Sequence, residues 1–289
     1  MAQAIDQYPG IELAAIHTRN AIVDPRYVKS IEQILTDKSI DSVFVAAPLN
    51  ERPGIILRAL QSGKHVLTEK PLSYNYTESS RLARLSKEMG LVLYVNYVHA
   101  HSPSISKLSN TMQNESISAL RIFFGQPGRL YEAEGVDSLL LSHGLSIAYI
   151  LAENTAIKWH VHTFNVDENG NPLAMVVSAD RSSRNSFSLE INVNLLYPER
   201  FRRVEVILCS STITADLIHP GRFATSSLQT GGKVSTREMF IDQNHTLDNV
   251  FKQFERCCKG EVIDNSADAV IIDRVIEKLR VSWSKNLGR

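Results

Sequence analysis

Cysteine is scarce in this chain of 289 residues. The 3 cysteines, Cys209, Cys257 and Cys258, all lie in the second half of the sequence. They form no C-x-x-C pair and have no metal-ligand spacing, which excludes a disulfide framework and a zinc module. We therefore expect free thiols, no metal, and a reducing cytoplasmic location.

An excess of charge of either sign is also missing. Lys+Arg and Asp+Glu both number 31, which gives a formal net charge of zero. Such a chain has no global field that would attract nucleic acid or an anionic membrane. Hydrophobic residues make up 43% of the sequence, which is enough for a buried core. We expect a globular protein that binds small molecules.

Long apolar runs are absent as well. No segment approaches the roughly 18 to 20 apolar residues that are needed to cross a bilayer. Residues 1–10 have neither the basic region nor the apolar stretch of a signal peptide. We therefore expect neither membrane insertion nor export.

The first third of the chain contains a regular alternation of short apolar segments and helical patterns. This alternation is typical of a parallel β-α-β sheet. The predicted strands are 11–18, 41–48, 65–69 and 91–98, and the predicted helices are 27–36, 52–62 and 77–89. We expect this region, residues 1–99, to form one domain.

The pattern changes after about residue 100. One helix follows Pro103, and strand-like stretches then dominate up to about residue 240. An amphipathic helix is predicted over residues 267–283. We expect residues 100–289 to form an α+β domain with a large, mostly antiparallel sheet.

Residues 42–71 combine three features in a fixed order. A buried strand ends at Ala47-Pro48, a helix ends at Gly63-Lys64-His65-Val66, and Glu69-Lys70-Pro71 follows. This combination resembles the Gfo/Idh/MocA oxidoreductases, where the strand, the helix and the E-K-P tripeptide lie at the mouth of the cofactor cleft. The resemblance continues through Asn96 and Ser142-His143.

The resemblance implies a fold and an assembly. In fold class the chain is expected to be α/β, with a truncated Rossmann-like parallel sheet in residues 1–99 that binds a dinucleotide. Residues 100–289 are expected to bind the substrate and to join copies of the chain into a homo-oligomer through their sheet.

The resemblance also implies a reaction, namely hydride transfer between NAD(P) and a sugar, cyclitol or related hydroxyl, ketone or imine substrate. Lys70 would bind the reacting oxygen or nitrogen, because an ammonium group stabilises developing negative charge. His143 would act as general acid or base, because hydride transfer leaves a proton to be moved and histidine titrates in the useful range. The alternatives are a solvent-facing Lys70 and a capping or core His143.

The cofactor cleft is expected to include residues from several strand ends. Thr18 and Arg19 follow the predicted strand 11–18, and an arginine there resembles the pattern of proteins that prefer NADP over NAD. A solvent-facing arginine is the alternative. The other residues that the resemblance assigns to this cleft are Ala47, Pro48, Asn50, Glu69, Lys70, Pro71 and Asn96.

The sequence departs from the family pattern at the phosphate turn. Gly10 and Gly54 are the only glycines in the first 60 residues, and neither lies in a strand-to-helix G-x-G-x-x-G turn. We interpret the chain as N-terminally incomplete, without the first strand and its glycine-rich turn, as a natural short form or as a truncation. An uncovered sheet flank predicts self-association.

A second departure concerns the surroundings of His143. Leu139 and Ser146 occupy positions where family members commonly have aspartates, and Asp137 is out of register. Two hypotheses follow: an NAD(P)-dependent oxidoreductase, which Lys70 and His143 favour, and a non-catalytic binding, regulatory or assembly module.

Two further clusters have a plain interpretation. His99 and His101 alternate as on a strand, but no third ligand has a recognisable spacing to them, so we expect a substrate-cleft or surface role. Arg200, Arg202 and Arg203 are expected to form a solvated loop.

Overall fold

The computed structural model describes residues 1–128, 135–152, 157–168, 170–181, 187–219, 221–229, 232–240 and 246–286. The chain divides into two compact units. Unit 1 comprises Met1–Asn96 and Leu247–Asp273, and unit 2 comprises Tyr97–Thr246 and Arg274–Arg289. No helix in the described ranges is long and apolar enough to span a membrane.

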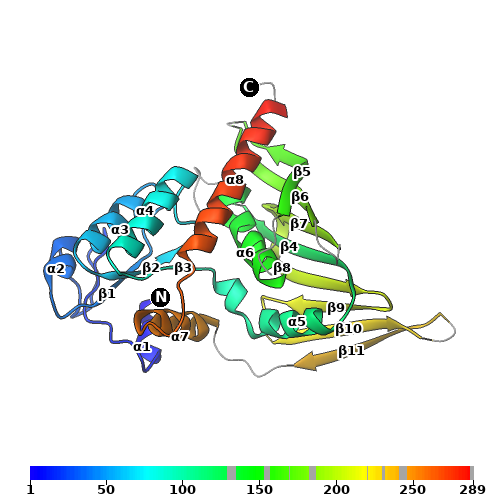
Figure 1. Ribbon diagram of the computed structural model, residues 1–289, viewed down its shortest axis with the longest axis horizontal. Helices are drawn as coiled ribbons and strands as arrows, with labels where there is room; N and C mark the ends of the chain where they lie inside the picture. The colour runs from blue at the N-terminus through cyan, green and yellow to red at the C-terminus, as the bar shows by residue number, and fades with distance from the viewer. Residues whose placement is uncertain are drawn as a thin grey trace. The chain divides into compact units, whose positions relative to one another are not determined.

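Unit 1 contains a parallel sheet in the order β1-β2-β3, as the sequence predicted (Figure 1). Its strands are β1 (Ser42–Val45), β2 (His65–Glu69) and β3 (Leu93–Asn96). Val45 lies opposite Thr68, and Glu69 lies opposite Asn96, so the three strands end at one edge. Ligands of open α/β sheets bind outside this carboxyl edge.

The helices of unit 1 are α1 (Ala2–Gln7), α2 (Ile31–Thr36), α3 (Arg52–Gln61), α4 (Tyr76–Glu88), and α7 (Thr246–Cys258). Side-chain caps set two of their starts. The Ser30 side chain accepts a hydrogen bond from the Glu32 N–H, and the Asn75 side chain accepts one from the Glu78 N–H.

Helix α7 packs against the sheet of unit 1. Val250, Phe251 and Phe254 form one buried cluster with Leu67 of β2 and Tyr94 of β3. No helix was predicted here from the sequence, and these residues were included in the domain 100–289, whereas the structure groups residues 247–258 with unit 1. The amphipathic pattern identifies the apolar face of a helix but not the sheet that covers this face.

The predicted strand at 11–18 is wrong. Within this segment only Ile16 forms a β-bridge, a parallel one to Tyr27. The predicted helix at 27–36 begins instead at Ile31, because Ser30 caps it. An apolar pattern becomes a strand only where a second strand supplies a ladder of hydrogen bonds, and here residues 26–28 supply a single bridge.

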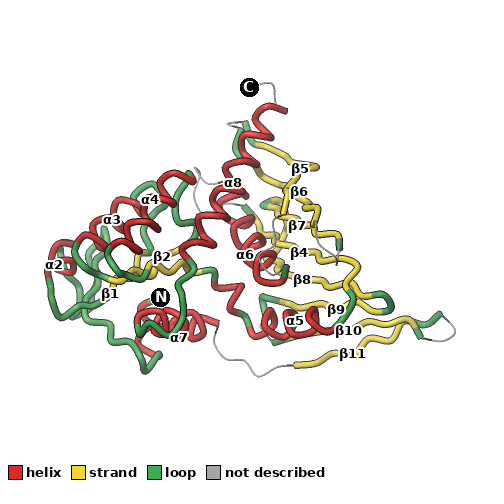
Figure 2. Tube along the Cα trace, viewed as in Figure 1, coloured by secondary structure: helices red, strands yellow, loops and turns green. Residues whose placement is uncertain are grey.

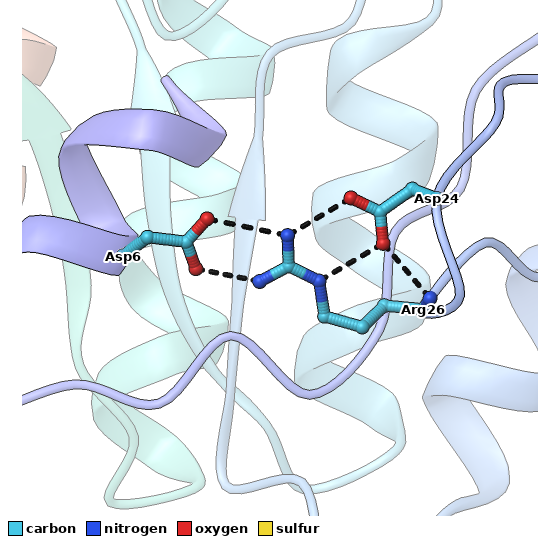
Figure 3. Close-up of polar contacts among 3 residues, drawn as sticks. All are labelled: Asp6, Asp24 and Arg26. Carbon is cyan, nitrogen blue, oxygen red and sulfur yellow. Dashed lines mark hydrogen bonds and ion pairs between the residues drawn. The ribbon is translucent and has the colours of Figure 1, made fainter.

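An arginine between two carboxylates ties α1 to the segment before α2 (Figure 3). Arg26 Nη1 lies 2.5 Å from Asp6 Oδ1, and its Nη2 lies 2.9 Å from Asp24 Oδ2. The hydrogen bonds from Arg26 lower the pKa of Asp24 to about 2. This network fixes the start of the chain over residues 24–26.

Unit 2 is built on an eight-stranded sheet in the order β11-β10-β9-β8-β4-β7-β6-β5. Among the described strands, β4 and β7 pair in parallel and all other neighbours pair antiparallel, so the sheet is mostly antiparallel, as predicted. Figure 2 draws these strands in yellow. The strands are β4 (Ile117–Pro127), β5 (Ile157–Val166), β6 (Pro172–Arg181), β7 (Ser188–Asn194), β8 (Leu196–Leu208), β9 (Ser211–Asp216), β10 (Arg222–Leu228) and β11 (Val234–Phe240).

The helical elements of unit 2 are the 3₁₀ helix η1 (Val98–His101), α5 (Pro103–Asn114), the π-helix η2 (Asp137–Leu141) and α6 (Ser142–Leu151). The last helix, α8 (Ser266–Asn286), begins in unit 1 and ends in unit 2. Helix α6 approaches the sheet closely at Gly144, where an added Cβ would lie 2.6 Å from Ile191 Cγ2. This close approach brings the preceding residue, His143, to the sheet.

Candidate active site

The carboxyl edge of the unit 1 sheet gathers most of the residues that the sequence assigned to a cofactor cleft. Glu69 ends β2 and Lys70 follows it, the Lys70–Pro71 peptide bond is cis, and Asn96 ends β3. Asn96 Nδ2 donates a hydrogen bond to Glu69 Oε1 at 2.8 Å. These side chains therefore lie together, as the parallel register requires.

Asn96 offers a buried acceptor at this edge. The residue is 3% exposed, and its Oδ1 has no hydrogen-bond partner within the described part of the chain. Buried amide oxygens normally have a partner, so this one is suited to a hydroxyl or N–H group of a ligand.

Arg52 joins the ends of β1 and β2, a role that the sequence analysis missed. The side chain is buried, and its Nε and Nη2 donate to the Ala47 carbonyl at 3.2 and 2.9 Å. Its Nη1 donates to the Pro71 carbonyl at 2.6 Å. The guanidinium group thus fixes the Ala47-Pro48 turn relative to the Glu69-Lys70-Pro71 turn. The signal in the sequence is an arginine at the first position of a helix that follows a strand-ending proline.

Thr18 and Arg19 reach the same region from the N-terminal segment. Arg19 forms an ion pair with Glu51, which directly follows Asn50 in the turn into α3. The Thr18 hydroxyl donates to the Asn20 carbonyl at 2.6 Å. Arg19 therefore lies beside the turn after β1 and is ion-paired as well as exposed.

A second cluster lies in unit 2 around His143. Its imidazole ring is stacked on Phe124 of β4 with centroids 5.8 Å apart, and it meets the ring of His99 edge to face at 4.8 Å. His99 and Phe124 also touch, with centroids 5.2 Å apart. The Ser146 hydroxyl donates to the backbone carbonyl of His143 at 2.8 Å.

One expectation about this region needs correction. His99 and His101 lie on the 3₁₀ helix η1 and not on a strand, so alternation does not place them on one face. His99 contacts His143, whereas burial lowers the pKa of His101 to about 4. Asp137 is committed elsewhere, because its Oδ2 lies 2.5 Å from Arg280 Nε in a buried ion pair.

The arginines at 200–203 do not form a loop. They lie on β8, where successive side chains point to opposite faces of the sheet. Arg202 is buried at 6% exposure beneath the helices, whereas Arg203 on the other face is half-exposed and paired with Glu205. Turn-like composition misled the prediction, because a row of arginines seldom enters a core.

A protein-family model described as an oxidoreductase family with an NAD-binding Rossmann fold matches residues 5–97. The chain is 30% identical over 128 residues to a dTDP-3,4-didehydro-2,6-dideoxy-alpha-D-glucose 3-reductase of Actinomadura kijaniata, which covers 42% of this chain and 39% of the reductase. It is 25% identical over 89 residues to a myo-inositol 2-dehydrogenase of Thermotoga maritima. This match covers 31% of this chain and 27% of the dehydrogenase. The matched region thus spans well under half the length of these relatives.

Solved structures share the fold over almost the whole chain. A 3-ketoreductase from Actinomadura kijaniata, solved with TDP-benzene and NADP, superposes with a TM-score of 0.81 at 15% identity, covering 96% of this chain and 91% of that protein. A UDP-N-acetylglucosamine 3-dehydrogenase from Acidithiobacillus ferrooxidans gives a TM-score of 0.79 at 15% identity. This superposition covers 93% of this chain and 88% of the dehydrogenase. At this level of identity the likeness concerns the fold.

Proposed function

We propose that this chain, which belongs to the Gfo/Idh/MocA oxidoreductase family through residues 5–97, is an NAD(P)-dependent oxidoreductase. One observation carries the proposal. Lys70 and the buried acceptor Asn96 lie at one edge of the parallel sheet, where Arg52 fixes the turns after β1 and β2 and Asn96 donates to Glu69. Such an edge is where open α/β sheets bind nucleotides.

The residues at this edge fit the nicotinamide half of the cofactor. Asn96 Oδ1 is a buried acceptor, and the Ala47-Pro48 turn presents backbone whose position Arg52 sets. When bound, the nicotinamide gives or accepts the hydride. The sequence given has no G-x-G-x-x-G turn, so we propose no residues for the pyrophosphate.

The choice between NADP and NAD is proposed from Arg19. Its guanidinium is exposed beside the turn after β1, and Glu51 holds it there. A phosphate on the ribose would compete with Glu51 for this guanidinium, because arginine binds phosphate with paired hydrogen bonds. We therefore favour NADP over NAD.

Lys70 and His143 are proposed to act on the substrate, each on the evidence of its own surroundings. The Lys70 ammonium would donate a hydrogen bond to the reacting oxygen and stabilise its developing charge. The imidazole of His143, packed between Phe124 and His99, would take or give the proton that hydride transfer leaves. We place the cofactor in unit 1 and substrate-binding residues in unit 2.

The substrate class is proposed from the relatives. Proteins similar to part of this chain include sugar 3-reductases, a myo-inositol 2-dehydrogenase and a D-xylose dehydrogenase. We propose a sugar or cyclitol that carries a hydroxyl group or the corresponding ketone.

A second candidate function is a non-catalytic module that binds or regulates. Asp137 favours it, because its ion pair with Arg280 removes one carboxylate from any role beside His143. In this case the edge of unit 1 would still bind the cofactor but no hydride would move.

The open face of the unit 2 sheet supports self-association. Tyr197 and Phe201 stack with centroids 5.7 Å apart, Phe123 lies 6.4 Å from Phe201, and Arg203 covers the Phe201 ring at 4.6 Å. Partly exposed aromatic rings on a sheet face are typical of protein interfaces. We propose a homo-oligomer through this face and, from the free thiols, a cytoplasmic location.

Calorimetric titration of NADPH and NADH into the purified chain tests the cofactor site. We expect saturable binding that is tighter for NADPH and that weakens in Lys70→Ala. Lys87→Ala, on the exposed last turn of α4, is the matched control and should bind as the wild type does. An absence of binding at millimolar cofactor would overturn the proposal.

A further inference from the structure

Arg202 is a buried guanidinium whose hydrogen bonds all go to neutral acceptors. Its Nη1 donates to the carbonyl of Gly125 and, at 2.9 Å, to the carbonyl of Phe201. Its Nη2 donates to Gln126 Oε1 at 2.8 Å. Its Nε is buried and has no hydrogen-bond partner in the residues that the structure describes.

The charge of Arg202 is not balanced by a carboxylate among the described residues. No ion pair includes it there, and the charge that acts on its pKa, that of Arg200, has the same sign. Burial and Arg200 together lower the pKa of Arg202 to about 10. Burying a charge without a partner costs far more than burying a paired one, so this position is unfavourable for stability alone.

Two N–H donors of Arg202 remain for a ligand. A guanidinium has five N–H groups, and here Nε–H and one N–H of Nη2 are left over. Neighbouring N–H groups of arginine bind the two oxygens of a carboxylate or phosphate side by side.

The guanidinium is also connected to the candidate catalytic histidine. Arg202 Cζ lies 5.0 Å above the centre of the Phe124 ring, and the same ring is stacked on His143 at 5.8 Å. A group bound by Arg202 would therefore lie one aromatic ring away from His143. All of these residues belong to unit 2.

We propose that Arg202 is the centre of an oxyanion site that binds a carboxylate or phosphate group of the substrate. Gln126 marks where the anion would bind, because its Oε1 already accepts from Nη2. The other hydrogen bond of this amide, to the Gly128 carbonyl, is long at 3.3 Å, so the side chain can be displaced at small cost. Only the identification of the anion as part of the substrate rests on the proposed function.

The site is tested without cofactor, by calorimetry and thermal denaturation with D-glucuronate, D-glucose 6-phosphate and neutral D-glucose. We expect both charged sugars to bind and to raise Tm. Glucose should bind at least tenfold more weakly than either of them. If only one charged sugar binds, the chemistry of the anion is settled as carboxylate or phosphate. If neither binds better than glucose, the proposal is wrong.

The variants use two adjacent arginines that point to opposite faces of β8. Arg202→Met should abolish the preference for charged sugars, because the donors that would hold the anion are removed. Arg203→Met, on the half-exposed face, should keep the preference. Equal loss in both variants would show a nonspecific field in place of a site.

A second substitution covers the case in which Arg202→Met does not fold. Gln126→Glu places a permanent carboxylate beside Arg202 Nη2. This variant should have a higher Tm and should bind the charged sugars at least tenfold more weakly. Unchanged binding in Gln126→Glu would contradict the proposal. Failure of nicotinamide binding with intact binding of charged sugars would overturn the proposed function and leave the oxyanion site standing.

Discussion

The imidazole rings of His99 and His143 meet edge to face with centroids 4.8 Å apart. The first comes from η1 and the second from α6, and both touch the ring of Phe124. Two imidazolium cations at this separation repel each other, so protonation of one ring opposes protonation of the other. We therefore predict that the two rings titrate as a coupled pair.

Removing His99 should change how His143 titrates. In the wild type we expect a coupled titration that departs from a single-site curve, and in His99→Phe a single transition. Proton–nitrogen NMR of the two rings measures this. His219→Gln, a histidine paired with Asp216 at the surface, should leave the curve of His143 unchanged. An identical His143 curve with and without His99 would show that the rings do not interact.

His101 should make the protein sensitive to acid. Burial lowers its pKa from 6.5 to about 4, so between these values the unfolded chain binds more protons than the folded chain. The stability that a neutral His101 permits is complete above pH 6.5 and is lost as the pH falls toward 4. Because the side chain keeps some exposure, we expect the unfolding free energy to fall by about 1–2 kcal/mol over this range.

The measurement is urea denaturation of the wild type and of His101→Gln at pH 7 and pH 4.5. Between the two pH values, the unfolding free energy of the wild type should fall by about 1–2 kcal/mol more than that of the variant. Equal losses would mean that His101 is already protonated in the folded protein at pH 4.5.

Arg52 should be required for the cofactor edge. Arg52→Met leaves the carbonyls of Ala47 and Pro71 without their donor, and we expect a loss of roughly 2–4 kcal/mol in unfolding free energy. We also expect NADPH to bind at least tenfold more weakly. The control is Arg58→Met, on the same helix as Arg52. It removes a surface ion pair to Glu32 of α2 and should change the unfolding free energy by less than about 1 kcal/mol. Normal cofactor affinity in a folded Arg52→Met protein would show that the turns keep their positions without it.

The ion pair of Asp137 and Arg280 should contribute to the stability of unit 2. Asp137 is buried, so Arg280→Met leaves a buried carboxylate without this partner and should cost roughly 2–4 kcal/mol. Adding Asp137→Asn should recover part of this loss, which a double-mutant cycle in urea measures. Lys278→Met, exposed on the same helix, is the control. A fully additive cycle would mean that the two side chains do not interact.

The regular part of unit 1 was predictable because each element carries its own signal. The strand that Pro48 stops and the helix that ends before Gly63 were both found close to their observed bounds. Periodicity and end signals of this kind are local, so they can be read without knowledge of the partner.

The first predicted strand and the sheet partner of α7 were not predictable in the same way. Residues 11–18 have the apolar pattern of a strand but only the bridge from Ile16 to Tyr27. Phe251 and Phe254 show that α7 is amphipathic, yet their contacts with Leu67 and Tyr94 span most of the chain. Both outcomes depend on tertiary pairing, which no local pattern encodes.

The candidate site likewise contains residues that the sequence indicated and contacts that it did not. Lys70 and Asn96 were predicted from the family resemblance, and the parallel register places the end of β2 beside Asn96. The contacts of Arg52 and of Arg202 could not be predicted, because an arginine that satisfies backbone carbonyls inside a protein looks like a surface arginine in the sequence. The meeting of His99 with His143 likewise joins segments that only the folded chain brings together.

Hydride transfer is measured by the passage of deuterium from NADPH labelled at nicotinamide C4 to keto-sugars, followed by mass spectrometry. We predict a product one mass unit heavier with the wild type, at least a hundredfold slower labelling with Lys70→Met and His143→Gln, and unchanged labelling with Lys87→Ala. Tight binding of NADPH without any labelled product across neutral and anionic keto-sugars would contradict the claim and establish the non-catalytic module.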